Sequence, residues 1–403
     1  MSSESRNWAF PPSKNIEQVR FSPVRQVMEN MNKYIREGKQ IITFHIGEPD
    51  FYTPGSVIEA TKIALDKRLT HYAPNRGSVN LRNSIAKLLS QRGMEYDPAT
   101  EVLVTAGGAE AIFAGLFAFL NAGDEVIVPT PSFMNYENVL AMIGAKYVEL
   151  PLTADDDFQI NIKELEKKIT DKTRMIILNN PSNPTGVIFT EKVLKSVAEI
   201  AIKYDLMVFS DEIYDEILYD DTKCVSIGTF EGMRDRAIVM NGFSKSHAMT
   251  GWRVGYLAAP AEAITSILKV HQYVVTCIPT FIQEGLAASM LQQECLEEKN
   301  QMVATFTKKR NLLMECLKKV PELTYIRPQG AFYMFLDVSK TGLSGTEFAT
   351  KLLDTKYVAV VPGVGFSSAA EDFVRLSFAT SEENIVEGIN RIREFVDSVQ
   401  KKN

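Results

Sequence analysis

Short apolar runs rich in valine and isoleucine recur through the middle of the chain, and they constrain the fold more than any other feature. They lie at 102–104, 126–128, 175–178, 206–209 and 237–240. Longer stretches of helical character separate them, for example 109–120, 191–204 and 261–270. Strands that alternate with helices in this way predict an α/β fold, in which helices cover both faces of a mostly parallel sheet.

The pattern changes beyond about residue 290. A long charged helix is predicted at 291–319, then strands at 331–336, 358–361 and 374–378 and helices at 346–354 and 382–399. This mixture indicates a smaller α+β unit, and a chain of 403 residues exceeds what one core usually supports. We therefore expect an N-terminal arm (1–14), a large domain (47–290) and a small domain built from 15–46 and 291–403.

Small or reactive residues directly follow each of the apolar runs. The segments are Thr105-Ala-Gly-Gly108, Pro129-Thr-Pro-Ser-Phe133, Asn179-Asn-Pro-Ser-Asn183-Pro-Thr-Gly186, Ser210-Asp211-Glu-Ile-Tyr214 and Asn241-Gly-Phe-Ser244-Lys245. Each alone is typical of turns and helix caps. In an open parallel sheet, however, ligands bind beyond the C-terminal ends of the strands. Their recurrence at successive strand ends therefore predicts one shared site.

Charge and cysteine content exclude several classes of protein. The chain has 44 Lys and Arg against 50 Asp and Glu, a formal net charge of -6, and lacks the basic footprint of a nucleic-acid binder. Its 4 cysteines and 4 histidines are scattered, so neither a metal site nor a disulfide framework is predicted. The N-terminus has no apolar signal-peptide core, and no stretch approaches the ~18 apolar residues of a membrane span. We expect a cytoplasmic protein without nucleic-acid or membrane partners.

An ordered series of motifs resembles the class I/II aminotransferases of fold type I, which use pyridoxal 5′-phosphate (PLP). The series is Gly47-Glu-Pro-Asp-Phe, Tyr72…Gly77…Leu81-Arg82, Thr105-Ala-Gly-Gly, Asn183-Pro-Thr-Gly, Ser210-Asp-Glu-Ile-Tyr, Ser244-Lys-Ser-His-Ala-Met-Thr-Gly-Trp-Arg253-Val-Gly-Tyr and Val374-Arg-Leu-Ser. The Ser-Lys pair followed by Gly-Trp-Arg is the most specific element. The resemblance implies a large domain with a mostly parallel seven-stranded sheet between helices, plus a smaller α+β domain.

The resemblance also assigns residues to the chemistry of the cofactor. Lys245 is expected to form a Schiff base with PLP and to move a proton between the substrate Cα and the cofactor. Asp211 is expected to pair with the pyridine nitrogen and keep it protonated. Tyr214 and Asn183 are expected to hydrogen-bond the phenolic oxygen, which lowers the imine pKa. Phe133 is expected to lie over the pyridine ring.

The cofactor phosphate needs donors and cations. Gly108 and Ala109 open a predicted helix, so their backbone N–H groups lie at its positive end. Ser244 and Arg253 are expected to complete the phosphate site, with Arg253 bidentate. Tyr72 matches a tyrosine that reaches the phosphate from the neighbouring subunit. The resemblance therefore implies a homodimer with shared active sites.

The substrate carboxylate is assigned to Arg375, through a bidentate pair helped by Asn183 and the backbone of Gly47. Because Gly47 and Arg375 come from opposite ends of the chain, the small domain is expected to close over the substrate. The implied reaction moves an amino group from an L-amino acid to a 2-oxo acid, with 2-oxoglutarate as the expected acceptor, by a ping-pong mechanism.

Other functions match less of the sequence. A PLP-dependent lyase, such as 1-aminocyclopropane-1-carboxylate synthase or a C–S lyase, shares the lysine, aspartate and tyrosine, but Gly251-Trp-Arg-Val-Gly-Tyr favours transamination. A regulator built on this domain carries a DNA-binding module, and no helix-turn-helix pattern precedes Gly47. A nicotinamide enzyme needs a third glycine that is missing after Gly363-Val-Gly365.

The amino donor stays open. Some aspartate-specific relatives have a lysine after the Gly-Gly pair, where this chain has Ala109. Arg20, Arg25 and Arg76 are candidate cations for a distal substrate carboxylate. Aspartate, alanine and aromatic amino acids all remain candidate donors.

Overall fold

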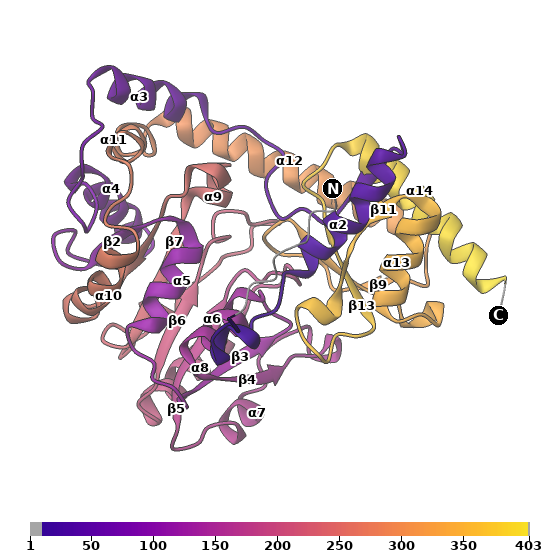
Figure 1. The fold of residues 1–403 in the computed structure, drawn as a ribbon, viewed down its shortest axis with the longest axis horizontal. Coiled ribbons are helices and arrows are strands. Elements are labelled where there is room, and N and C mark those ends of the chain that lie inside the picture. Colours follow the sequence, from indigo (N-terminus) through magenta and orange to yellow (C-terminus); the bar gives the residue numbers. More distant parts are fainter. Residues whose placement is uncertain (1–9, 402–403) are drawn as a thin grey trace.

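A seven-stranded sheet forms the larger part of the computed structural model, which describes residues 10–401 (Figure 1). Its order is β2-β8-β7-β6-β5-β3-β4. The strands are β2 (Val102–Thr105), β3 (Glu125–Thr130), β4 (Lys146–Pro151), β5 (Thr173–Asn179), β6 (Met207–Asp211), β7 (Ala237–Gly242) and β8 (Gly255–Ala258). Neighbours from β7 to β4 are parallel, whereas β8 is antiparallel to β7 and β2. The predicted mostly parallel sheet is confirmed.

Both faces of the sheet are buried, because successive side chains of a strand point to opposite sides. Met175 and Ile177 of β5 pack under one layer of helices, and Ile176 and Leu178 pack under the other. The first layer is α5 (Gly107–Phe117), α6 (Asn135–Ile143) and α10 (Ala261–Val274). The second is α3 (Gly55–Asp66), α4 (Val79–Ser90), α7 (Ile162–Lys167), α8 (Glu191–Lys203) and α11 (Thr280–Ser289).

The smaller part is an α+β unit that contains the C-terminal end of the described chain (Figure 1). Its antiparallel sheet has the order β12-β13-β10-β9, and β1 pairs in parallel with β11. The strands are β1 (Ile42–Thr43), β9 (Thr324–Tyr325), β10 (Tyr333–Asp337), β11 (Val358–Ala359), β12 (Val361–Pro362) and β13 (Phe373–Ser377). The helices are α2 (Pro23–Arg36), α13 (Gly345–Lys356) and α14 (Glu382–Gln400).

Helix α12 (Gln293–Leu317) runs along both parts, from beside α3 to α14 (Figure 1). Its buried residues recur every three or four positions, which is the pattern of a helix with one face turned to a core. They include the charged residues Lys299, Lys309 and Arg310. Burying a cation without a partner is costly, so these three residues are expected to form ion pairs in the interior.

The N-terminal segment divides between the two parts. Residues 1–9 of the predicted arm lie outside the described residues. Helix α1 (Lys14–Glu17) lies against α6, where the Asn15 amide donates to the carbonyl of Met142 at 2.9 Å. Helix α2 begins at Pro23, as the Ser22-Pro23 pair suggests, and packs near β12.

The sequence missed β4 and β8 in the large sheet. β4 is an edge strand with one buried residue, so it has no continuous apolar run. β8 is only four residues long and contains neither valine nor isoleucine. The predicted strand 358–361 is interrupted at Val360, which separates β11 from β12. Short 3₁₀ helices lie at 154–156, 227–229, 250–252, 339–341 and 363–365. Among residues 10–401, no helix is both long enough and apolar enough to cross a membrane.

Candidate active site

A cavity of about 260 Å³ opens where the strands of the large sheet end. Eleven of the residues predicted for the site line it. They are Gly47, Gly108, Ala109, Phe133, Asn183, Asp211, Tyr214, Ser244, Lys245, Arg253 and Arg375. Strands β2, β3, β5, β6 and β7 all run toward this edge, so residues more than 130 positions apart meet there.

The reversed direction of β8 explains how Lys245 and Arg253 reach the same edge. Strand β7 ends at Gly242, and α9 (Phe243–Ser246), which carries Lys245, follows at once. The chain then turns and starts β8 at Gly255, which pairs with Gly242. The residues just before β8 therefore lie at the edge where β7 ends, and Arg253, two positions before the strand, has a left-handed backbone with φ of 58°.

Lys245 is the amine of the cavity. Its Nζ donates to the carbonyl oxygen of Gly47 at 2.6 Å. Burial lowers the pKa of Lys245 to about 8, and the cations of Arg375 and Arg253 act in the same direction. An amine with this pKa is partly unprotonated near neutral pH, which is the form that attacks a carbonyl carbon.

Asp211 at the end of β6 is a buried carboxylate with its own donors. Tyr136 of α6 donates to Oδ2 at 2.6 Å, and the backbone N–H of Ile213 donates to Oδ1 at 3.1 Å. Burial raises the pKa of Asp211 to about 6, although both donors oppose the rise. A cationic group bound beside Asp211 in the cavity would stabilise the ionised form of this carboxylate. Sequence reasoning missed Tyr136, which stands outside the quoted motifs.

The start of α5 offers a site for an anion. The backbone N–H groups of Gly108 and Ala109 lie in the first turn of this helix. The Arg253 guanidinium is held there by the carbonyl oxygens of Thr250 at 2.8 Å and Ala106 at 3.2 Å. Gly107 has φ of 73°, and a Cβ on it would lie 2.5 Å from Arg253 Nη2. The close approach of the arginine to the helix start therefore requires a glycine.

Arg375 of β13 contributes a buried guanidinium to the lining of the cavity. Its Nη1 donates to Asn183 Oδ1 at 3.0 Å, and its Nη2 donates to the carbonyl oxygen of His45 at 2.7 Å. Burial lowers the pKa of Arg375 from its ordinary value, but a guanidinium stays charged near neutral pH. Its buried Nε has no hydrogen-bond partner among the described residues, so the guanidinium still has a donor that is not satisfied.

Two tyrosines also line the cavity, Tyr214 and Tyr333. The hydroxyls of Tyr214 and Tyr333 lie 2.8 Å apart, and the Tyr333 ring lies 4.5 Å from the guanidinium carbon of Arg375. Sequence reasoning missed Tyr333, although it lies in the predicted strand at 331–336. The other predicted aromatic residue, Phe133, meets Tyr136 edge-on with ring centroids 5.9 Å apart. The predicted stacking of Phe133 on the cofactor stays a prediction.

Tyr72 does not line the cavity. It is 87% exposed, in the segment between α3 and α4. Tyr273 and Val274, at the end of α10, are also exposed. The Asn75 amide donates to the carbonyl of Thr276 at 2.8 Å, which brings these two segments together. Exposed apolar side chains on neighbouring segments are typical of an interaction surface.

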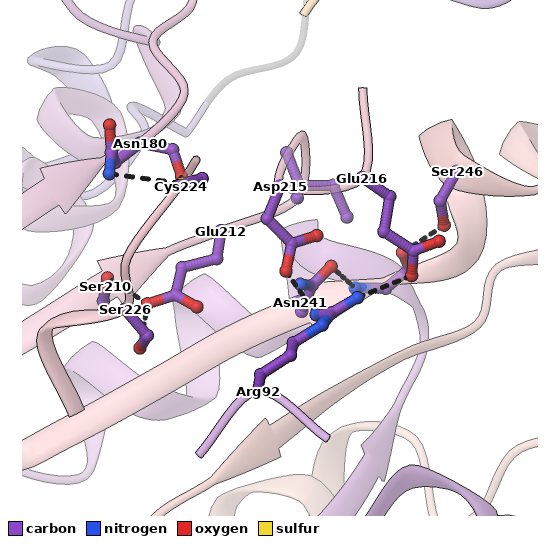
Figure 2. A network of polar contacts seen from close by, with 12 residues as sticks. Arg92, Asn180, Ser210, Glu212, Asp215, Glu216, Cys224, Ser226, Asn241 and Ser246 are labelled. Atoms are coloured by element: carbon purple, nitrogen blue, oxygen red, sulfur yellow. Dashed lines mark hydrogen bonds and ion pairs between the residues drawn. The ribbon is translucent and has the colours of Figure 1, made fainter. Parts of the chain in front are cut away.

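A buried network of charges supports the segment that carries Asp211 and Tyr214. Figure 2 shows Arg92 between the carboxylates of Asp215 and Glu216. Lys299 of α12 forms an ion pair with the same Glu216. Glu212 accepts from Ser210 at 2.9 Å and from Ser226 at 2.6 Å. Burial raises the pKa of Glu212 to about 7, whereas Lys299 and Arg92 lower the pKa of Glu216, so Glu212 contributes less negative charge than Glu216 near neutral pH.

Helix α12 forms two further ion pairs, with residues that follow Gly47 and Asp211 in the chain. Lys309 pairs with Asp50, three residues after Gly47. Arg310 binds Asp220 through two hydrogen bonds of 2.7 and 2.8 Å. Together with Lys299, these residues tie one helix to the Gly47 segment and to the segment after Asp211.

Comparison with known protein families identifies the family to which this chain belongs. The sequence model of the family "Aminotransferase class I and II" matches residues 39–392. The chain belongs to the class I and II aminotransferases. It is 42% identical over 355 residues to an aspartate aminotransferase of Pyrococcus abyssi, covering 88% of this chain and 91% of that protein. It is 40% identical over 382 residues to aromatic-amino-acid aminotransferase 2 of Thermococcus litoralis, covering 94% of this chain and 97% of that protein.

The fold of this aminotransferase matches solved members of the family. The structure of the aspartate aminotransferase from Thermus thermophilus with maleate superposes with a TM-score of 0.91 at 34% identity. The match covers 96% of this chain and 99% of that one. The chain therefore has the PLP fold type I architecture, and its reaction is a transamination. The PLP-dependent lyase is not favoured by these relatives.

The residues of the cavity fit the cofactor of the family, pyridoxal phosphate. Lys245 offers an amine for its carbonyl carbon, and Asp211 offers a carboxylate for its ring nitrogen. The helix start beside Arg253 offers backbone donors and a guanidinium for its phosphate. This donor set corresponds group by group to the cofactor's polar groups.

Proposed function

We propose that this aminotransferase holds pyridoxal phosphate on Lys245 and exchanges an amino group between an L-amino acid and a 2-oxo acid by a ping-pong mechanism. One observation carries the assignment: the Lys245 amine, with a lowered pKa, shares one cavity with the buried Asp211 carboxylate and with Arg375. When bound, the cofactor withdraws electrons from the substrate Cα, so that its proton can leave.

The residues of the chain then have distinct roles. Arg375 binds the α-carboxylate and fixes the position of Cα, helped by Asn183 and the backbone of Gly47. Lys245 Nζ would serve as the base that accepts the proton leaving Cα and as the acid that later donates one. Asp211 would pair with the protonated ring nitrogen, and Tyr214 and Asn183 would hydrogen-bond the phenolic oxygen. Phe133 would cover the ring, and Ser244, Arg253, Gly108 and Ala109 would hold the phosphate.

The assignment of Lys245 is tested with Lys245→Ala. The wild-type holoenzyme is reduced with borohydride and digested, and mass spectrometry locates the cofactor adduct. We expect the adduct on the peptide that contains residue 245 in the wild type and no adduct in the variant, with an unchanged far-ultraviolet circular dichroism spectrum. A reducible adduct on the same peptide of Lys245→Ala would refute the assignment.

The reaction type is tested by a half-reaction. With an amino acid and no oxo acid, a transaminase converts the bound cofactor to its pyridoxamine form and releases one equivalent of oxo acid. A lyase instead releases products repeatedly and leaves the absorbance of the bound cofactor unchanged at the end. Ping-pong kinetics with 2-oxoglutarate as the acceptor are expected.

The amino donor is proposed from the relatives, whose names refer to aspartate and to aromatic amino acids. The candidate distal cations all have other partners within the chain: Arg20 lies 3.6 Å from Glu137, Arg25 lies 2.9 Å from Glu29, and Arg76 donates to the carbonyl of Thr100. None of these arginines lines the cavity. These arginines therefore give no reason to prefer a dicarboxylic donor, and the range of candidate donors stays aspartate, alanine and aromatic amino acids. A donor panel, scored by the loss of the cofactor band, measures that range.

We also propose a cytoplasmic homodimer in which Tyr72 reaches the phosphate site of the neighbouring subunit. Support comes from the exposed Tyr72, Tyr273 and Val274 described above, and the free cysteines suit a reducing cytosol. A small domain of 15–46 and 291–403 is proposed to close on the large domain of 47–290 when the substrate binds, with 1–14 as an arm. Sedimentation as a monomer, or equal scattering radii with and without substrate, would contradict these two parts of the proposal.

A further inference from the structure

Tyr333 contacts two site residues that come from different parts of the fold. Its hydroxyl lies 2.8 Å from that of Tyr214, which follows β6. Its ring lies 4.5 Å from the guanidinium carbon of Arg375 in β13. The β10–β13 register pairs Phe335 with Arg375 and places Tyr333 diagonally across from that arginine on the same face. Only 1% of the Tyr333 side chain is exposed.

We propose that Tyr333 is a positioning residue with two separable functions. Its hydroxyl donates to Tyr214 and so directs the Tyr214 proton to the phenolic oxygen of the cofactor. Its ring supports the Arg375 guanidinium in the orientation that binds the substrate α-carboxylate. The proposal rests on the proposed function, because it needs Tyr214 to face the cofactor and Arg375 to face the substrate.

Counting protons fixes the direction of the hydrogen bond between the tyrosines. A tyrosine hydroxyl has one proton to donate and lone pairs to accept with. An ionised phenolic oxygen on the cofactor can only accept a hydrogen bond, so Tyr214 must use its proton to donate a hydrogen bond to that oxygen. Its bond to Tyr333 then persists only if Tyr333 is the donor. A donor behind Tyr214 polarises the Tyr214 O–H bond and strengthens its bond to the cofactor.

The ring acts on Arg375 through stacking. The guanidinium already donates to Asn183 and to the carbonyl of His45, and these two bonds fix one edge of its plane. The Tyr333 ring covers a face of that plane, which is a cation–π contact in a desolvated place. The geometry also constrains Gly47, because a Cβ there would lie 2.9 Å from the Tyr333 hydroxyl oxygen. A side chain at position 47 would therefore force either the Tyr333 hydroxyl or the Gly47 backbone to shift.

Two variants separate the functions, and a third serves as a matched control. Tyr333→Phe removes only the hydroxyl, and Tyr333→Leu removes the ring as well. Tyr219→Phe removes the hydroxyl of another buried tyrosine, which donates to the carbonyl of Ala331 and whose ring lies 4.6 Å from Arg310. The holoenzymes are titrated with pH while the visible absorbance of the bound cofactor is recorded. KM and kcat are then measured for the best donor of the panel.

The first readout is the pH midpoint of the cofactor band, which reports how tightly Lys245 Nζ holds its proton. A weaker donor at the phenolic oxygen leaves more negative charge beside that proton. We therefore expect the midpoint of Tyr333→Phe to rise by roughly half to one pH unit, the equivalent of one hydrogen bond. Tyr219→Phe should titrate like the wild type. Equal midpoints in Tyr333→Phe and the wild type would overturn the role of the hydroxyl.

The second readout separates the ring from the hydroxyl. We expect KM in Tyr333→Phe to stay within about two-fold of the wild type, because the ring remains. Tyr333→Leu should raise KM by about 2- to 30-fold, the range of a cation–π contact. A wild-type KM in Tyr333→Leu would overturn the role of the ring. A wild-type holoenzyme with no lysine-linked cofactor band would instead refute the proposed function itself.

Discussion

The buried network of charges around Arg92 is expected to contribute to the stability of the fold, and the variant Lys299→Met tests this. The Lys299 ammonium pairs with Glu216, and its side chain is only 10% exposed. Methionine has a similar length and helix propensity, so the change removes the charge and leaves the helix intact. Two carboxylates, Asp215 and Glu216, then share the single cation of Arg92.

The expected magnitude follows from that imbalance. Removing one partner of a buried ion pair destabilises a protein by about 3–5 kcal/mol, because the other charge is left buried. An unfolding entropy of about 2.1 cal/mol/K per residue over 403 residues converts this loss into a fall in Tm of about 4 to 6 °C. Lys308→Met is the matched control: Lys308 lies on the exposed side of the same helix, so its Tm should change by less than about 1 °C.

The assay is thermal unfolding of the holoenzymes, followed by circular dichroism at several pH values. Glu216 is buried, but the charges of Lys299 and Arg92 outweigh that burial and lower its pKa to about 2, from an ordinary value of 4.5. A lowered carboxyl pKa stabilises the fold above the unfolded pKa, and this stabilisation is lost as pH falls toward the folded pKa. In Lys299→Met, Glu216 takes up a proton more readily. The Tm difference between variant and wild type should therefore be largest above about pH 5 and shrink as the pH falls below about 4.5.

Two results would refute this reasoning. A Tm difference that is the same at pH 7 and at pH 4 would mean that the lost stability is not electrostatic. A Lys299→Met variant as stable as Lys308→Met would mean that the ion pair with Glu216 contributes nothing net to stability.

Two further predictions concern the cavity. Arg375→Ala should raise KM for every amino donor by roughly 10- to 150-fold in a steady-state panel of donors. All donors share the α-carboxylate, and hydrogen bonds to charged groups contribute about 1.5–3 kcal/mol. A rise confined to one donor would assign Arg375 to side-chain recognition instead. Gly107→Ala should weaken cofactor binding by at least about ten-fold, measured by fluorescence titration of the apoenzyme, because its Cβ would lie 2.5 Å from Arg253 Nη2. Gly123→Ala is its control, since Gly123 also has a positive φ, of 89°, but no atom lies within 4 Å of the added Cβ. A similar loss of cofactor affinity in both variants would show that backbone strain, rather than the contact with Arg253, is responsible.

The sequence predicted the strands that are buried on both faces, since only those produce continuous apolar runs. It missed β4, which is half-exposed at the edge of the sheet, and β8, which is short. The site was predictable where reactive residues directly follow such runs, as Asp211 and Lys245 do. Tyr333 and Tyr136 were not, because each meets its partner through the packing of separate elements. Placing Tyr333 beside Arg375 requires the register of β10 on β13, and no pattern within either strand contains that register.

Helix α12 limits how this chain can change in length. Lys299 and Arg310 are eleven positions apart, close to three turns of an α-helix, so both point to the interior. Inserting one residue between them would rotate everything beyond the insertion by about 100° and turn one of the cations into solvent. Substitutions on the exposed face of the helix do not change the direction in which Lys299 and Arg310 point. Natural or engineered insertions should therefore occur in the connections on either side of α12 and be absent between Lys299 and Arg310.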